Sequence, residues 1–247
     1  MTSPIEPRTQ TKLYHAPPQI AGAVWITVGG ILTIYALQLG LAPAIGGLAA
    51  AAVGFVAVAI ELVIAARLGQ FSLGVRRPAP RYVVAAVLIG LACWYLEIQL
   101  VLHVHPPGDT TRIAEVVERT ALPVSLIVLA MLPAIGEELL FRGVFTRSLA
   151  RMPMLAIAGS AILFSAYHLQ PAQMLGTFPL GLALGLLAVR SGSIVPGMIA
   201  HFLNNATVLA VERLNLSALE LHPNLTFSAA AVLVIGGVAL ASTGSVA

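Results

Sequence analysis

Three short stretches of the sequence carry ionisable residues inside otherwise apolar segments. The first contains Glu137, Glu138 and Arg142, the second ends at His168, and the third begins with His201. An ionisable group inside a membrane span costs roughly 2.5–3.5 kcal/mol on insertion scales, so such residues are functional candidates by default. These stretches are therefore the places where the chain could do chemistry.

Carboxylates, imidazoles and amides can together hydrolyse an acyl bond. A carboxylate and an imidazole that face a trapped water can remove its proton, which supplies a nucleophile. A second imidazole and an amide can donate hydrogen bonds to the oxyanion that forms when hydroxide adds to a peptide carbonyl, and each donor is worth ~3 kcal/mol. The residue types are thus complete for acyl transfer to water.

Spacing along a helix determines which of these side chains share a face. Residues four apart lie on one face. Glu137 is rotated by roughly 100° from Glu138, which leaves it free to face a different neighbour. The pairs that share a face are Glu138 with Arg142, Phe164 with His168, and His201 with Asn205.

The composition indicates that lipid is the solvent for most of the chain. Of the 247 residues, 58% are hydrophobic and only 9% are charged, whereas soluble domains carry about 25% charged residues. Apolar segments recur at about 17 to 25 residues, the length that a tilted helix needs to cross hydrocarbon. We expect an all-α, polytopic transmembrane helical bundle of about eight spans. These are residues 20–40, 43–66, 82–104, 121–144, 154–169, 172–189, 193–211 and 225–243.

Two polar interruptions divide the spans. The sequence HLQPAQ at residues 168–173 predicts a break between the fifth and sixth spans, because proline ends a helix. The polar segment 106–120 is expected to form a short interfacial helix.

The depth of the polar residues is an independent check on a common site. With a rise of about 1.5 Å per residue from the inner ends of the spans, the Glu, His and Asn candidates lie about 12 to 21 Å deep. Three spans therefore place polar groups in one middle layer, which predicts a site between the fourth, fifth and seventh spans.

The distribution of basic residues predicts the orientation. With the N-terminus inside, only Arg112, Arg119 and Arg213 of the 13 Lys and Arg fall on the outer side. Because cytoplasmic loops carry the positive excess, we expect a multi-pass protein of the inner (cytoplasmic) membrane with both termini cytoplasmic. The basic residues lie between apolar spans, so they are topology signals and no nucleic-acid partner is expected. Cys93 is the single cysteine, which excludes an intrachain disulfide.

The three stretches resemble the motifs of the CAAX-protease and bacteriocin-processing (CPBP, or Abi) family of intramembrane endopeptidases. The matching segments are EELLFR at residues 137–142, FSAYH at 164–168 and HFLNN at 201–205. Their order and their placement on separate spans also agree with the family. The ordered triplet is more specific than any one of the motifs.

The resemblance implies a role for each motif residue. Glu137 with His168 would activate the water, and His201 with Asn205 would stabilise the oxyanion. The substrate would be a membrane-associated protein or peptide in the lipid bilayer, and the Ala-, Leu- and Arg-rich composition is typical of a bacterium, so a prenylated substrate is not expected. The first motif is completed by Glu138 and Arg142.

The sequence also predicts how the chain is organised. We predict a cytoplasmic polar N-terminal tail over residues 1–19 and a multi-span membrane protease domain over residues 20–245, with the motifs within 137–205. The family is often labelled as metalloproteases, although a glutamate-dependent mechanism without metal is also argued for it. Two Glu and two His could bind zinc by ligand type, but the usual HExxH helix is absent. We expect no cofactor, with zinc as the alternative.

Other interpretations of the same residues stay open. Glu138 and Arg142 could be a purely structural ion pair, Arg142 could mark the inner interface, and Asn204 could be a helix-packing amide. Glu61 and Glu97 are expected near an interface or paired locally. At the level of function, the alternatives are a proton-coupled transporter whose Glu and His relay protons, and a non-catalytic bacteriocin-immunity or scaffold protein of the membrane.

Overall fold

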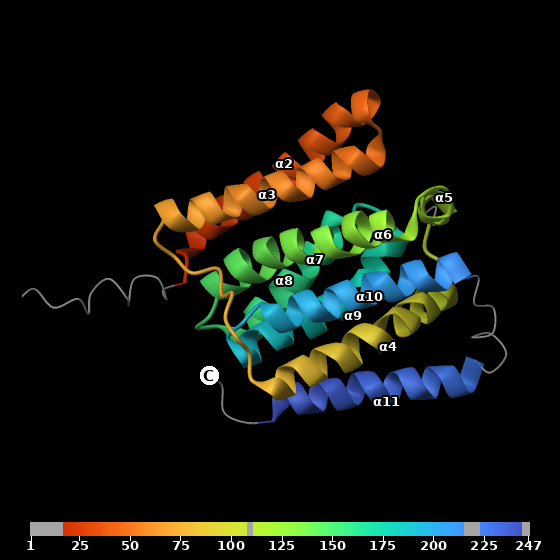
Figure 1. The fold of residues 1–247 in the computed structure, drawn as a ribbon. Coiled ribbons are helices and arrows are strands. Elements are labelled where there is room, and N and C mark those ends of the chain that lie inside the picture. The colour runs from red at the N-terminus through yellow and green to blue at the C-terminus, as the bar shows by residue number, and fades with distance from the viewer. Residues whose placement is uncertain (1–16, 108–110, 215–222, 244–247) are drawn as a thin grey trace, which may run out of the picture.

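The computed structural model describes residues 17–107, 111–214 and 223–243, and every regular element in those ranges is a helix. The helices run alongside one another in a bundle (Figure 1). The tail predicted over residues 1–19 lies almost wholly outside the described residues. The helices are α2 (Ile20–Ile45), α3 (Gly47–Leu68), α4 (Pro80–Val104), α5 (Thr111–Arg119), α6 (Leu122–Ser125), η1 (Leu126–Met131), α7 (Leu132–Glu137), η2 (Glu138–Thr146), α8 (Pro153–Tyr167), α9 (Pro171–Ser191), α10 (Val195–Leu214) and α11 (Pro223–Ser242).

The predicted membrane bundle is confirmed. Five helical runs are long and apolar enough to cross a membrane, namely α2, α3, α4, residues 122–146 and α9, and shorter apolar helices cover Pro153–Tyr167 and Thr226–Ser242. The chain is therefore a multi-pass membrane protein. The predicted interfacial segment contains a helix, α5, which packs against the end of α10 where the Arg213 side chain donates to the carbonyl groups of Val117 and Glu118.

Proline sets the start of several helices. Pro80, Pro153 and Pro171 open α4, α8 and α9, where the missing N–H is not needed for a helical hydrogen bond. Between α8 and α9 the chain turns through Leu169, which has a φ of 59°. The predicted break in HLQPAQ is thus confirmed.

The helical run over residues 122–146 contains two π-helical segments, η1 and η2. A π turn closes i→i+5 hydrogen bonds, so it is wider than an α turn and separates consecutive side chains by a smaller angle. The apolar pattern of the sequence did not predict these segments. The second one begins at Glu138, which is within the first motif.

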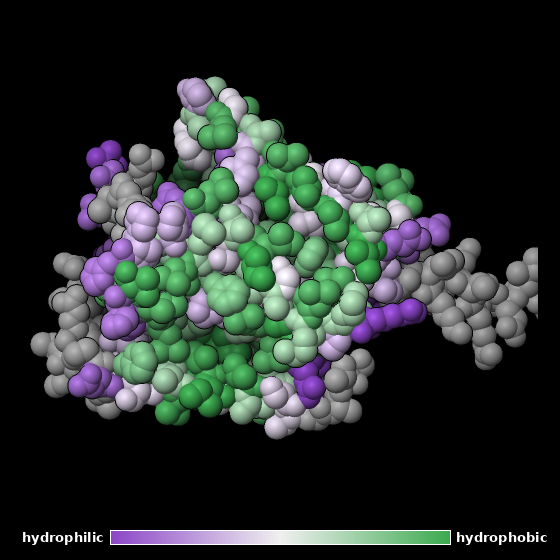
Figure 2. Space-filling model, turned by 180° about the vertical axis from the view of Figure 1, so that it is seen from behind, coloured by the Kyte–Doolittle hydropathy of each residue, from purple (hydrophilic) through white to green (hydrophobic). Residues whose placement is uncertain are grey.

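Apolar side chains cover the surface in a broad zone, and hydrophilic residues gather at its two ends (Figure 2). Large apolar residues of α2, α3 and α11 are exposed, including Trp25, Leu39, Leu68 and Ile235. Such exposure is unfavourable in water but matches a lipid environment.

One end of the bundle is tied together by the loop between α3 and α4, residues 69–79, which we call the strap. Ser72 accepts a hydrogen bond from Arg147 Nε at 2.9 Å, and Gly74 accepts one from the backbone of Ile194 at 3.0 Å. Ser193 Oγ donates to the Arg76 carbonyl at 2.6 Å. The strap therefore joins the end of η2 to the turn between α9 and α10, so loops that carry basic residues meet at one end, as the charge distribution predicts.

Candidate active site

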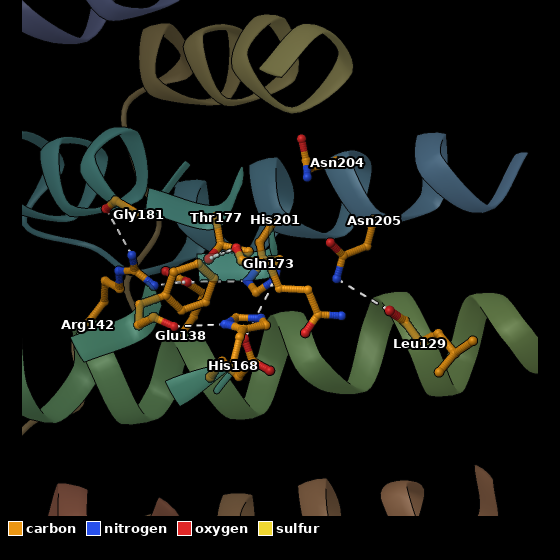
Figure 3. A network of polar contacts seen from close by, with 12 residues as sticks. Leu129, Glu138, Arg142, His168, Gln173, Thr177, Gly181, His201, Asn204 and Asn205 are labelled. Carbon is orange, nitrogen blue, oxygen red and sulfur yellow. Dashed lines mark hydrogen bonds and ion pairs between the residues drawn. The ribbon is translucent and has the colours of Figure 1, made fainter. Parts of the chain in front are cut away.

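The candidate residues come from three helical runs that meet inside the bundle. Glu137 ends α7 and Glu138 begins η2, while His168 follows directly after α8. His201 and Asn205 lie on α10, on the side that faces the helix carrying Glu138 (Figure 3). The predicted site between the fourth, fifth and seventh spans is thus assembled in space.

Glu138 and Arg142 form a fully buried ion pair. Arg142 Nη1 lies 2.7 Å from Glu138 Oε1, and both side chains are 0% exposed. A second guanidinium nitrogen, Nη2, donates to the Gly181 carbonyl on α9 at 2.9 Å. The suggestion that Arg142 marks the inner interface is therefore wrong, because the spacing brings it to Glu138 inside the bundle, where a buried charge needs a partner.

The Phe164 ring is the centre of the cluster. Its centroid lies 5.6 Å from that of Phe141, 5.2 Å from His168 and 5.4 Å from His201, each in an edge-on arrangement. The Arg142 guanidinium carbon lies 4.7 Å from the same ring centroid, a distance at which a cation is attracted to an aromatic face. The second motif thus contacts residues of both other motifs through one side chain.

His201 lies between the two glutamates. Its Nε2 is 3.8 Å from Glu137 Oε2 and its Nδ1 is 3.5 Å from Glu138 Oε1, and all three side chains are buried. Glu137 and Glu138 therefore share His201 as a neighbour, while the partner of Arg142 is Glu138. The wide turn that begins at Glu138 and the length of the Glu side chains let both carboxyl groups reach one imidazole.

His168 is held by its own helix. Its Nδ1–H donates to the Phe164 carbonyl at 2.8 Å, because a carbonyl oxygen can only accept. In this tautomer Nε2 carries the lone pair and can accept a proton. No ion pair joins His168 to Glu137 among the residues that the structure describes, so the joint action that the resemblance implies stays a prediction.

The two asparagines of the third motif point in different directions. Asn205 Nδ2 donates to the Leu129 carbonyl of η1 at 3.3 Å, on the same side of α10 as His201 (Figure 3). Asn204 Nδ2 donates to Glu97 Oε2 on α4, also at 3.3 Å. The interpretation of Asn204 as a packing amide is thus confirmed. Glu97 was expected near an interface or paired locally, but it is buried and its partner belongs to another helix.

Sequence reasoning missed several residues around Glu137 and Glu138. The Tyr35 hydroxyl of α2 donates to the Tyr167 carbonyl, and both phenols are close enough to Glu137 to interact with its charge. Gly197 lies against Glu138, and an added Cβ there would overlap Oε2 of that carboxylate. Tyr167 belongs to the second motif and Gly197 stands four residues before the third, so both could have been suspected, but nothing in the sequence connects Tyr35 to the site.

The arrangement does not fit a metal site. Among the described residues, no group of three His, Cys, Asp or Glu side chains is arranged to hold a metal ion. One of the four candidate ligands, Glu138, is already bound by Arg142 at 2.7 Å, and a guanidinium charge at that distance opposes a divalent cation.

Fold and site together define a multi-pass membrane protein whose ionisable residues converge inside a helical bundle. Residues 119–207 match the family model of type II CAAX prenyl endopeptidase Rce1-like proteins. The resemblance to the CAAX-protease and bacteriocin-processing family is thereby confirmed, and at the level of the family it indicates a CAAX-type intramembrane protease. The matched segment contains all six candidate residues and excludes α2, α3, α4 and α11. No curated protein and no solved structure matches the chain.

Proposed function

We propose that the protein is an intramembrane endopeptidase that hydrolyses a peptide bond of a membrane-associated protein or peptide, with Glu137 as the base that activates water. The observation that carries this proposal is the convergence of all three motifs on one buried cluster, in which Glu137 Oε2 lies 3.8 Å from His201 Nε2. A water oxygen can lie about 2.8 Å from both atoms at once, since their separation is less than twice a normal hydrogen-bond length.

The first step is proton transfer from this water. Glu137 Oε2 is buried and has no hydrogen-bond partner among the described residues, so it is an open acceptor. His168, with its Nδ1 proton directed to the Phe164 carbonyl, offers Nε2 as a second acceptor that orients the water. The resulting hydroxide oxygen bonds to the carbonyl carbon of the substrate.

The negative charge that develops on the carbonyl oxygen needs donors. His201 and Asn205 lie on one side of α10 (Figure 3), and the Asn205 amide has a second N–H besides the one directed to Leu129. When the C–N bond breaks, the proton held by Glu137 passes to the leaving nitrogen. The products are a carboxylic acid and an amine, which ionise to a carboxylate and an ammonium group in water, and Glu137 returns to its ionised form.

The Glu138–Arg142 pair has a supporting role in this mechanism. It lies behind Glu137 and His201, with Glu138 Oε1 3.5 Å from His201 Nδ1. In the imidazolium form of His201, Nδ1–H is directed to this carboxylate and Nε2–H faces the reaction, where it can donate to the oxyanion.

We also propose an orientation in the inner membrane with both termini cytoplasmic. The start of α2 and the end of α11 lie at the same end of the bundle as the strap (Figure 1), and this end carries Arg67, Arg76, Arg147 and Arg190. The excess of basic residues at one end supports cytoplasmic exposure of that end. Reporter fusions at each terminus, active either in the cytoplasm or outside it, test the assignment.

The test of the activity is cleavage of membrane-tethered reporter peptides by the purified full-length protein in detergent. Wild type is compared with Glu137→Ala and His168→Ala, each with and without a strong chelator. We expect cleavage by the wild type with and without chelator, and none by either variant. Loss of wild-type activity on chelation would assign a metal-dependent mechanism. Absence of wild-type cleavage across a broad library, or normal cleavage by both variants, would favour a transporter or an immunity protein.

A further inference from the structure

A second buried polar contact lies on another side of α10, and the proposed mechanism does not use it. It joins Asn204 Nδ2 to Glu97 Oε2 of α4 at 3.3 Å, and the two side chains are 3% and 9% exposed. Figure 3 shows Asn204 pointing away from His201 and Asn205. A carboxyl group inside a membrane bundle is costly to bury, so its retention needs a physical reason.

Glu97 has polar neighbours on its own helix and on α10. Besides the Asn204 amide, the thiol of Cys93, one turn earlier on α4, lies close to its carboxyl group, whereas Glu97 Oε1 is buried without a hydrogen-bond partner among the described residues. The same carboxyl group is close enough to His201 to interact with it electrostatically. Glu97 therefore lies next to the candidate site, on the side of α10 that packs against α4.

A backbone contact holds α4 against α10 nearby. A Cβ added at Gly90 would lie 2.5 Å from the Ala200 carbonyl oxygen and 2.9 Å from its Cα, so only glycine lets the two helices approach this closely. Ala200 and Asn204 are four residues apart, and they share one face of α10. Helix α4 therefore contacts one face of α10 at two points, Ala200 and Asn204.

The face of α10 that contacts α4 determines where the candidate residues point. His201 and Asn205 each follow one residue after Ala200 and Asn204, which places them about 100° further around the helix. Turning α10 about its axis would break the Gly90 contact and the Glu97 hydrogen bond together. It would also move the imidazole away from Glu137.

We propose that Glu97 is a positioning residue, which through Asn204 fixes the rotation of α10 and so directs His201 and Asn205 towards Glu137. This inference rests on the proposed function. The support comes from outside the segment that matches the family, since Glu97 precedes residue 119. Glu97 acts through the side-chain oxygen that accepts the hydrogen bond from Asn204.

The experiment compares cleavage kinetics of purified wild type, Glu97→Leu, Glu97→Gln, Asn204→Leu and the Glu97→Leu/Asn204→Leu double variant. Because misplacing a catalytic group by about 1 Å can cost 10²-fold, we expect Glu97→Leu to lower kcat roughly ten- to a hundredfold with KM nearly unchanged. Gln keeps a side-chain oxygen that accepts from Asn204, so Glu97→Gln should retain most of the activity. The double variant should be no slower than either single variant.

The matched control is Glu61→Leu, which removes another carboxyl group from a membrane helix, α3, and should leave kcat unchanged. Wild-type kcat in Glu97→Leu would overturn the positioning role while leaving the proposed function intact. Equal losses in Glu97→Gln and Glu97→Leu would also overturn it, since charge would then matter rather than the hydrogen bond. An inactive wild type would overturn the proposed function itself. In that case, additive shifts of the melting temperature in the same variants would overturn the Glu97–Asn204 coupling as well.

Discussion

Two helical regions of similar apolar character are used in opposite ways in this protein. Helix α2 and the helical run over residues 122–146 both qualify as membrane spans, yet 22% of the most apolar stretch of the first is buried inside the protein, against 61% in the second. The buried run carries Glu137, Glu138 and Arg142, whereas α2 contains no charged residue. These three charges are thus placed where protein, not lipid, surrounds them.

The comparison shows that hydropathy alone does not separate a lipid-facing span from a span that carries chemistry. What separates them is whether polar groups on neighbouring helices can satisfy the charges, as the His201 side chain and the Gly181 backbone carbonyl do here. Matched substitutions in the two regions test this directly.

The largest difference is expected between two membrane carboxyl groups. Glu137→Gln should lower kcat about 10³- to 10⁴-fold, because it removes the proposed base. Glu61→Gln, at a partly buried position of α3, should change kcat less than about twofold, within the small effects usual away from special sites. Steady-state cleavage of one reporter peptide measures both. Similar losses in the two variants would contradict a special role for the inner region.

Removing a buried charge should have the next largest effect, which is a loss in the free energy of unfolding. Arg142→Leu leaves Glu138 buried without its partner, which should cost about 3 kcal/mol or more in the free energy of unfolding. Arg67→Leu, at an exposed position of α3, should stay within about 0.5 kcal/mol of wild type. Denaturation in mixed detergent micelles gives both values, and equal stabilities would show that the ion pair is dispensable.

Amide groups provide a third comparison. Asn205→Ala removes a proposed oxyanion donor and should lower kcat about 10²-fold without a large change in KM. Gln38→Ala, on α2, also removes an amide but should leave kcat at the wild-type level. An Asn205→Ala enzyme that turns over at the wild-type rate would require another donor for the oxyanion.

Glycines should give the smallest difference. In Gly197→Ala the added methyl group overlaps the pinned Glu138 carboxylate, and such overpacking costs about 1–3 kcal/mol. At Gly40 of α2 an added Cβ meets nothing within 4 Å, so Gly40→Ala should be neutral or stabilise by up to about 1 kcal/mol. Melting temperatures of the two variants measure the difference. The value should fall in Gly197→Ala and should stay the same or rise in Gly40→Ala. Equal shifts in the two variants would contradict tight packing at Gly197.

Much of the architecture follows from the sequence because bilayer thickness limits what an apolar segment can do. The spans and the break at HLQPAQ could be predicted from length and proline position alone. The Glu138–Arg142 pair followed from helical spacing. The common location of the three motifs followed from residue depth, since helices that cross the same layer bring equal depths together.

The remaining features depend on distances between helices, which spacing within one helix does not contain. Both glutamates reach His201 because a π turn begins at Glu138, and the residue pattern of a π turn resembles that of an α turn. Glu97 was expected near an interface or paired locally, but its partner Asn204 is 107 residues away. Tyr35 is brought to the site by the packing of α2, which is likewise a long-range contact.

The strap has a consequence for the order in which the protein is made. Its partners at Arg147, Ser193 and Ile194 are synthesised long after residues 69–79 have left the ribosome. The first two spans can enter the bilayer as a hairpin, but the strap can close only when the turn between α9 and α10 has been inserted. The hydrogen bonds of the strap therefore form only after the later helices have been inserted. Helices that are synthesised early reach their final packing through contacts with helices that are synthesised late.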